Sequence, residues 1–360
     1  MKKERSTKLK INKNTGASIA KDVKIMKPPF VLFLGDAQEF LAAKSATGLV
    51  YWRREDCIGQ VRMPNCQIPL DLPKIDLAKA VRLGAKTFVI GVTTHGGILS
   101  PSWYPYILSA IEHGLDIATG THDRLSDVPE FIAAAKKFGV RLLDLRHTDI
   151  RIPQATGLKR QGRRLLTVGT DCACGKKFTA LTITRDMKKR GIDCTFRGTG
   201  QTGIMISGGG FAVDSIVGDF IGGAAELLSP RNKPNHWDVI EGQGSILHPS
   251  HAGVPVSLLH GSQPDAYVVC HEPTRTHMVG VTYPIPSIAA IREATEYMGR
   301  LTNPNIRCVG ISVNTSEYQG DVSKLKQQLR KEYNVPVIDP VIDGANEIID
   351  YMQSIGLLTE

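Results

Sequence analysis

The sequence predicts an α/β protein made of two doubly wound domains. Two observations lead to this fold class. Apolar segments of strand length alternate with segments of helix length, which is the pattern of parallel sheets joined by helical crossovers. A polar and basic connector at 149–164 interrupts this alternation, which then begins again. We therefore expect an N-terminal domain at 29–154 and a C-terminal domain at 155–360, preceded by a disordered basic leader at 1–28.

The first block contains two fully apolar runs, at 30–34 and 87–92, with the composition of strands buried on both faces. Its expected strands lie at 30–34, 48–52, 87–92, 115–118 and 141–145. Its expected helices lie at 37–45, 76–83, 103–113 and 128–138.

The second block repeats the alternation after the connector. Its expected strands lie at 165–168, 194–197, 237–241, 266–270, 306–313 and 336–338. Its expected helices lie at 176–190, 215–228, 287–300, 322–333 and 344–355. The first of these strands runs into a glycine-rich loop and then into a helix, which is the order of a P-loop NTPase-like domain.

The positive charge of the chain is concentrated in its first residues. The net charge is +9, and residues 1–27 contribute +7 of it, from nine Lys/Arg against two Asp/Glu. The nearly neutral remainder offers no basic surface, so we expect no nucleic-acid partner. No apolar run is long enough to span a bilayer, and the leader lacks the apolar core of a secretory signal. We expect a cytoplasmic protein with no membrane partner.

Seven cysteines are scattered through the chain, without the spacing of a disulfide framework. Reduced thiols are therefore expected. Cys172 and Cys174 form a CxC pair, but no second pair stands at zinc-binding spacing. We expect no metal.

The glycine-rich loop joins the strand at 165–168 to the helix at 176–190. Glycines let backbone N–H groups turn toward an anion, the helix N-terminus adds its dipole, and a lysine adds a point charge. Five residues separate the two glycines, one more than in the usual Walker A loop, and this spacing resembles that of dethiobiotin synthetase. The residues expected to bind a phosphate-bearing ligand are Gly169, Thr170, Asp171, Cys172, Ala173, Cys174, Gly175, Lys176 and Lys177.

Lys177 stands where an ATPase has a Ser or Thr whose hydroxyl binds Mg²⁺. A cation there repels Mg²⁺, so the loop keeps its phosphate site but lacks a standard metal ligand. This favours a ligand whose phosphates are held and not transferred, such as coenzyme A. Two alternatives stay open: an ATP-dependent kinase or ligase like dethiobiotin synthetase, and a nucleotide-binding module without catalysis.

Polar residues follow or flank other strands of the second block. Glu241 ends the strand at 237–241, and Gln201 and Thr202 follow the strand at 194–197. Because the carboxyl ends of adjacent parallel strands converge, Glu241 and Lys176 are expected to face one crevice. Asp219 lies near the start of a helix, where capping explains it as well as ligand binding does.

Histidines and arginines supply further candidates. Five histidines crowd into 248–277, and as a group at strand ends they are expected to include a base or a substrate ligand. His248 and His251 lie just beyond Glu241. In the first block, Arg53 and Arg54 can hold a substrate carboxylate by bidentate pairing.

These segments together resemble the DgcN-type D-glutamate N-acetyltransferases, a family long described as a domain of unknown function. The matching segments are 169–177, 198–203 and 240–245, and the resemblance covers the chain from residue 30 onward. It implies a Rossmann-like N-terminal domain and a P-loop C-terminal domain. It also implies that acetyl-CoA donates its acetyl group to the α-amine of D-glutamate.

Direct acetyl transfer needs a general base for the amine and a donor to the thioester oxygen. The candidates for the base are Glu241, Asp219 and His251. The candidates for binding the acidic substrate are Arg53, Arg54, Gln201, Thr202 and His248. The expected partners are the small-molecule substrates acetyl-CoA and D-glutamate, and we expect a homo-oligomer.

Overall fold

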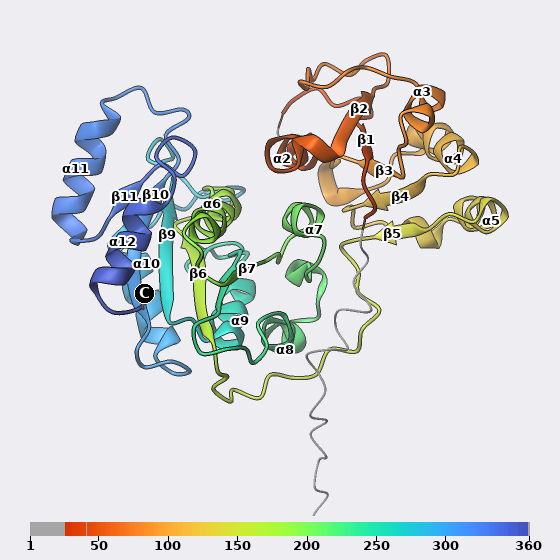
Figure 1. The fold of residues 1–360 in the computed structure, drawn as a ribbon. Coiled ribbons are helices and arrows are strands. Elements are labelled where there is room, and N and C mark those ends of the chain that lie inside the picture. Colours follow the sequence, from red (N-terminus) through yellow and green to blue (C-terminus); the bar gives the residue numbers. More distant parts are fainter. Residues whose placement is uncertain (1–25, 41, 359–360) are drawn as a thin grey trace, which may run out of the picture.

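The computed structural model describes residues 26–40 and 42–358. Two lobes, each built on its own sheet, lie beside one another (Figure 1). The prediction of two doubly wound α/β domains is confirmed. The expected leader at 1–28 lies almost entirely outside the described residues. None of the described helices is long and apolar enough to cross a membrane.

The first sheet has five parallel strands in the order β2-β1-β3-β4-β5. Its strands are β1 (Phe30–Phe33), β2 (Cys57–Val61), β3 (Thr87–Ile90), β4 (Asp116–Thr119) and β5 (Leu142–Asp144). Its helices are α2 (Lys44–Trp52), α3 (Leu77–Arg82), α4 (Tyr104–Glu112) and α5 (Pro129–Phe138). Most residues of these strands are apolar and buried, so the sheet is covered on both faces.

The prediction of a strand at 48–52 is wrong, because this segment is the second half of helix α2. A short apolar run does not distinguish a strand from a buried helix by periodicity. The buried residues Ser45, Ala46, Gly48 and Leu49 follow helical spacing and turn one face of α2 inward. The helix predicted at 37–45 starts only at Lys44, after bends and turns. The second strand of the sheet is instead β2, which the sequence reading missed.

The second sheet has six parallel strands in the order β11-β10-β9-β6-β8-β7. Its strands are β6 (Arg163–Gly169), β7 (Cys194–Arg197), β8 (Trp237–Ile240), β9 (Ala266–His271), β10 (Arg307–Val313) and β11 (Val337–Ile338). All six lie within a residue or two of their predicted positions. Each is an apolar run bounded by polar residues or glycine, which makes such strands easy to recognise.

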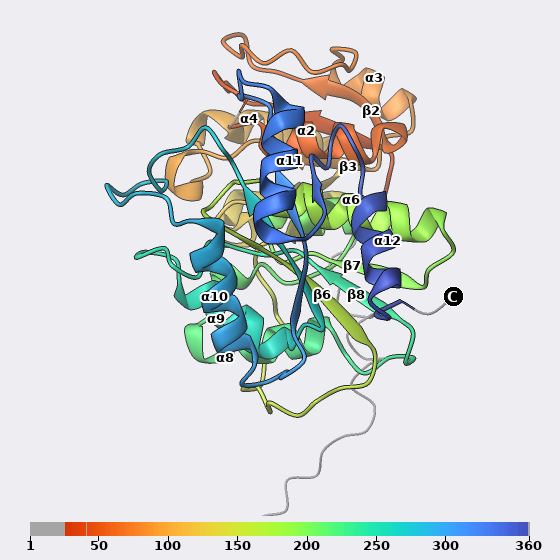
Figure 2. The same ribbon diagram turned by 90° about the vertical axis from the view of Figure 1, so that its left-hand side faces the viewer.

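Helices cover both faces of the second sheet (Figure 2). One face carries α6 (Lys176–Lys189) and α12 (Asn346–Ser354); the other carries α9 (Gly253–Ser262) and α10 (Ile288–Gly299). α8 (Gly218–Leu228) packs on the outer side of α9, and α11 (Val322–Tyr333) lies beside β11. The sequence reading missed α9 and the short α7 (Gln201–Ser207), because both lie in glycine-rich or histidine-rich segments that read as loops.

α2 of the first lobe packs against α7 of the second, as Figure 1 shows. The hydroxyl groups of Ser45 and Thr202 share a hydrogen bond of 2.9 Å across this junction, and both side chains are buried. A second link is the ion pair between Arg146 and Asp214. Arg146 is itself buried and also donates to the Gly120 carbonyl, 2.9 Å away. These contacts join the two lobes into one body.

Candidate functional site

Three neighbouring strands end at the same edge of the second sheet. β6, β8 and β7 are adjacent and parallel, so the segments that leave their carboxyl ends meet there. The chain leaves β6 toward one side of the sheet and later returns to β9 on its other side. Ligands of open α/β sheets bind at such a switch point. The glycine-rich loop, Glu241 and the start of α7 all lie there.

The glycine-rich loop has the backbone conformation of an anion site. Ala173 and Gly175 have positive φ, 53° and 101°, and the loop ends directly at the N-terminus of α6. Lys176 is the first residue of that helix and is 6% exposed. Its Nζ folds back and donates to the Asp171 carbonyl at 2.6 Å. Among the described residues, no carboxylate lies within 4.0 Å of this ammonium, which leaves its charge available to an anion.

Asp171 anchors the loop through hydrogen bonds to the protein. Its carboxylate accepts from the Cys172 N–H at 2.7 Å, from Arg275 Nη1 at 2.7 Å and from the Val279 N–H at 2.9 Å. It is fully buried. Since donors already surround it, Asp171 ties the loop to the segment that follows β9.

A magnesium ligand of the usual P-loop kind is missing. The helix position after Lys176 is Lys177, and the nearest hydroxyl on the helix is that of Thr179. Thr179 Oγ1 is buried, bonded to the Gly175 carbonyl at 3.1 Å and to Ser312 Oγ at 2.8 Å. This hydroxyl therefore holds α6 against β10 and is not free to coordinate a metal beside a phosphate.

Glu241 is buried and held by backbone donors. Its Oε2 accepts from the N–H groups of Thr199 and Gly200, at 2.9 and 3.1 Å. Thr199 Oγ1 in turn donates to the Glu241 carbonyl at 2.6 Å and accepts from Gln243 Nε2 at 3.0 Å. Gly203 lies against the carboxylate, because a Cβ there would come within 2.9 Å of Cδ and closer still to Oε2.

Two lysines lie near Glu241 and shape its electrostatics. The Lys176 side chain crosses Gly242, where a Cβ would stand 3.1 Å from Lys176 Cδ. Burial raises the pKa of Glu241, although Lys177, the two backbone N–H groups and Lys176 oppose the rise. Burial also lowers the pKa of Lys177 from 10.5 to about 8, against the pull of Glu241. The pair thus contains a carboxylate that is more basic and an ammonium that is more acidic than usual.

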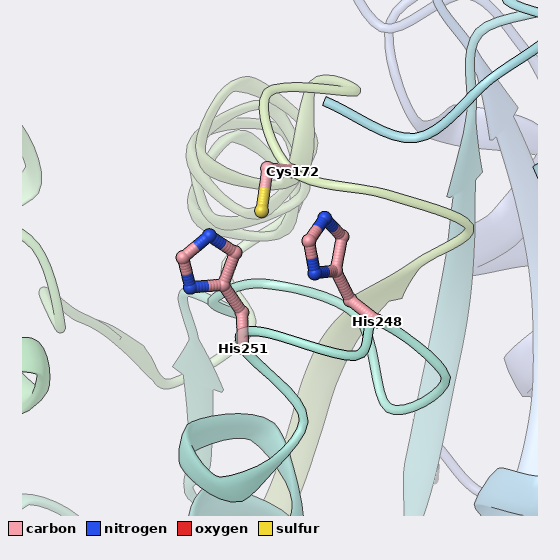
Figure 3. A group of neighbouring side chains, drawn as sticks. All are labelled: Cys172, His248 and His251. Carbon is pink, nitrogen blue, oxygen red and sulfur yellow. The ribbon is translucent and has the colours of Figure 1, made fainter. Parts of the chain in front are cut away.

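Cys172, His248 and His251 meet beside the loop (Figure 3). Their metal-binding atoms all lie within 4.8 Å of one another. His248 is fully buried: its Nε2 bonds the Val279 carbonyl at 3.0 Å and its Nδ1 accepts from the Ser250 N–H at 3.1 Å. His251 is exposed, with its ring centroid 4.6 Å from that of His248. Burial raises the pKa of the Cys172 thiol, which keeps it from acting as a ready nucleophile.

Thr170 contacts a different histidine. Its Oγ1 lies 3.0 Å from Nδ1 of His271, the last residue of β9. Burial lowers the pKa of His271, and Arg275 adds to this while Glu272 opposes it. A neutral His271 then supports the loop from the side of β9.

The arginines expected to bind substrate have partners in the protein. Arg53 forms an ion pair with Asp56 at 2.6 Å, reaches the Met205 carbonyl at 3.4 Å, and lies 4.8 Å over the Phe30 ring. Arg54 is exposed and bonds the Cys57 carbonyl at 3.3 Å. Of the two, Arg54 is the more accessible to a ligand.

Gln201, Thr202 and Asp219 also have structural surroundings. Gln201 packs against Gly120 of the first lobe, and the Thr202 hydroxyl is bonded to Ser45. Asp219 is exposed in the first turn of α8, where the helix dipole stabilises its negative charge. The structure brings together Lys176, Lys177, Glu241, Cys172, His248 and His251; Gln201 and Thr202 lie at the junction of the lobes.

Several residues of this region were missed from the sequence. Thr199 and Gln243 position Glu241, and Arg275 locks Asp171. Arg275 lies on the segment after β9, so no local motif links it to the loop. Cys172 and the two histidines were each noted separately, and only the spacing of His248 and His251, three residues apart, gave a signal that they act together.

Comparison with known protein families identifies both halves of the chain. Residues 151–349 match the model described as "Domain of unknown function (DUF1611_C) P-loop domain". Residues 60–148 match "Domain of unknown function (DUF1611_N) Rossmann-like domain". Both halves therefore match parts of one two-domain family.

Two relatives cover nearly the whole chain. A protein of Pseudoalteromonas sp., named D-glutamate N-acetyltransferase, is 46% identical over 90% of this chain and 98% of its own length. A protein of Tritonibacter scottomollicae with the same name is 43% identical over 92% of this chain and 100% of its own length. A crystal structure of a DUF1611-family protein from Anabaena variabilis superposes with a TM-score of 0.81 at 27% identity, covering 91% of this chain and 100% of that one.

Proposed function

The chain belongs to the DUF1611 family, and from this premise we propose that it transfers the acetyl group of acetyl-CoA to the α-amine of D-glutamate. The observation that carries the proposal is the identity of 43–46%, over almost their full length, to two proteins with that named activity. The geometry of the site agrees with this reaction, which needs an anion site for coenzyme A and a base for the amine.

The glycine-rich loop is the proposed site for a phosphate of coenzyme A. Its turned backbone and the N-terminus of α6 favour an anion, as does the ammonium of Lys176, which has no carboxylate partner among the described residues. The phosphates of coenzyme A are bound and not transferred, so the missing magnesium hydroxyl is no obstacle. The same feature weighs against the kinase or ligase alternative.

Glu241 is the proposed general base. Transfer forms a bond between the substrate nitrogen and the acetyl carbon and breaks the carbon–sulfur bond, releasing coenzyme A as a thiol. The amine must lose a proton, which Glu241 accepts, and the protonated Glu241 can then donate that proton to the leaving sulfur. Burial raises the pKa of Glu241, and a carboxyl group with a raised pKa is a better proton acceptor. Its Oε1 is the oxygen not used by the Thr199 and Gly200 N–H groups.

An acceptor assay tests this function. The purified protein is incubated with acetyl-CoA and a panel of D- and L-amino acids, and free thiol is measured with a thiol reagent. We expect thiol release with D-glutamate and, by mass spectrometry, N-acetylglutamate as product. No release above background with any acceptor would overturn the proposal. Magnesium-dependent ADP formation from ATP with a carboxylate substrate would instead favour the ligase alternative.

A further inference from the structure

The strongest unassigned feature is the side-chain cluster of Cys172, His248 and His251. A thiol and two imidazoles, contributed by the loops after β6 and β8, converge at one point (Figure 3). We infer that these three residues form a binding site for a divalent metal ion of the zinc class.

Two of the three ligand groups have no other partner among the residues that the structure describes. Within the described part of the chain, neither Cys172 Sγ nor a ring nitrogen of His251 forms a hydrogen bond, whereas the other side chains around the loop are firmly bonded. Thiolate and imidazole are the donors that zinc prefers, while Mg²⁺ prefers oxygen. The donor set therefore selects a softer cation than the one P-loop ATPases use.

His248 has the support that a metal-binding histidine normally has. Its Nε2–H donates to the Val279 carbonyl and lies 3.7 Å from an Asp171 carboxylate oxygen, which fixes the tautomer and leaves Nδ1 with the free electron pair. Among the described residues, Nδ1 accepts only the N–H of Ser250, which is an exposed residue. A metal would replace that single contact.

The separations suit a metal after a small closure. Zinc bonds of about 2.0–2.3 Å put tetrahedral ligand atoms about 3.3–3.6 Å apart. In this structure the candidate ligand atoms lie within 4.8 Å of one another, and the exposed His251 side chain can move inward. A turn from His248 to His251, closed by the His251 N–H on the His248 carbonyl at 3.2 Å, already holds the two rings together.

Three protein ligands leave the fourth position of a tetrahedral site open, as catalytic zinc sites do. The cysteine spacing alone predicts no metal site, because the sequence has no second cysteine pair at zinc-binding spacing. In the structure, the two histidines after β8 supply the ligands that a second cysteine pair would otherwise provide. The inference does not depend on the proposed acetyl transfer, since metal binding is measured without substrates.

Metal analysis of the untagged protein tests the site. The protein is treated with a chelator, equilibrated with Zn²⁺, desalted and analysed by mass spectrometry of its metal content. We expect one zinc per chain. Cys172→Ser and His251→Ala should each weaken zinc binding at least about 10-fold in competition with a chromogenic chelator. Cys66→Ser and His277→Ala, a half-buried thiol and an exposed imidazole elsewhere, are matched controls that should bind like the wild type.

Cobalt gives an independent readout. Co²⁺ bound to the wild type should show a thiolate charge-transfer band in the near ultraviolet, and Cys172→Ser should abolish it. The inference is overturned if the wild type holds no more zinc than the Cys172→Ser/His251→Ala double variant. It is also overturned if the cobalt band persists in Cys172→Ser. Because His251 is exposed, its variant reports on the site even if Cys172→Ser folds poorly.

Discussion

Glu241 owes its position to backbone N–H groups and to the missing side chain at Gly203. A methyl group at Gly203 would overlap the buried carboxylate. Gly203→Ala should therefore move Glu241 and lower kcat at least about 10-fold, the scale of losing a positioned base. Gly218→Ala is the matched control, since Gly218 also lies in a helix and a Cβ there meets nothing within 4 Å. Equal activities of the two variants would contradict this role for Gly203.

The lowered pKa of Lys177 should make the free energy of unfolding depend on pH. Its pKa is about 8 in the folded protein and 10.5 as the reference. The unfolded chain therefore binds more protons between these values, so the free energy of unfolding rises with pH from about 8 to about 10.5. Relative to Lys177→Met, the wild type should gain stability across that window in urea titrations.

Lys188→Met is the control for this titration, because Lys188 is exposed on the same helix. The pH dependence of Lys177→Met should differ from that of Lys188→Met over the same window. If the two variants show the same pH dependence, Lys177 is solvated in the folded state.

At the level of single residues, sequence reasoning located groups whose role follows from local context. The position of Lys176 at the start of α6 could be predicted, because a lysine that follows a strand and a glycine-rich loop commonly begins the next helix in a phosphate-binding loop. The contacts of Thr202 and Arg53 could not be predicted from the sequence, because each residue bonds a partner in the opposite lobe. Thr202 bonds Ser45, and Arg53 bonds the Met205 carbonyl. Distant partners of that kind leave no local pattern.

Among the helices, α2 and α7 form the seam between the lobes. Their buried hydroxyl pair, Ser45 and Thr202, lies within that seam. Ser45→Ala and Thr202→Val should each lower the free energy of unfolding by about 1–3 kcal/mol, because each leaves the other hydroxyl unsatisfied. The double variant should lose less than the sum of the two. Strict additivity in urea unfolding would show that the two hydroxyls do not interact.

The strand and helix predictions failed where α2 forms and succeeded where the second sheet forms. The strands of the second sheet are isolated apolar runs, so length and flanking residues identify them. The segment of α2 contains small and apolar residues that fit either structure, and only its packing on α7 and on the sheet decides. Tertiary contacts of this sort override local preference.

For the whole molecule, the connector belongs with the second lobe. Ile150 and Ile152 pack against the apolar cluster of Phe211, Ala224 and Leu228. Arg160 donates to the carbonyls of Ser229 and Gly261, at 2.9 and 2.7 Å. We propose that the second domain begins near residue 150 and not at 155. A polar connector reads as a boundary in the sequence, but its hydrogen bonds to one lobe become visible only in the structure.

The proposed function depends most on the binding of coenzyme A phosphates by the glycine-rich loop and Lys176. Steady-state kinetics of Lys176→Ala with acetyl-CoA and D-glutamate test it most directly. Loss of a charge-assisted contact of about 1.5–3 kcal/mol should raise the KM for acetyl-CoA about 10- to 100-fold, while kcat changes little. The KM for D-glutamate should stay near the wild-type value. A fall in kcat at unchanged KM for acetyl-CoA would contradict the claim and make Lys176 a participant in the chemical step.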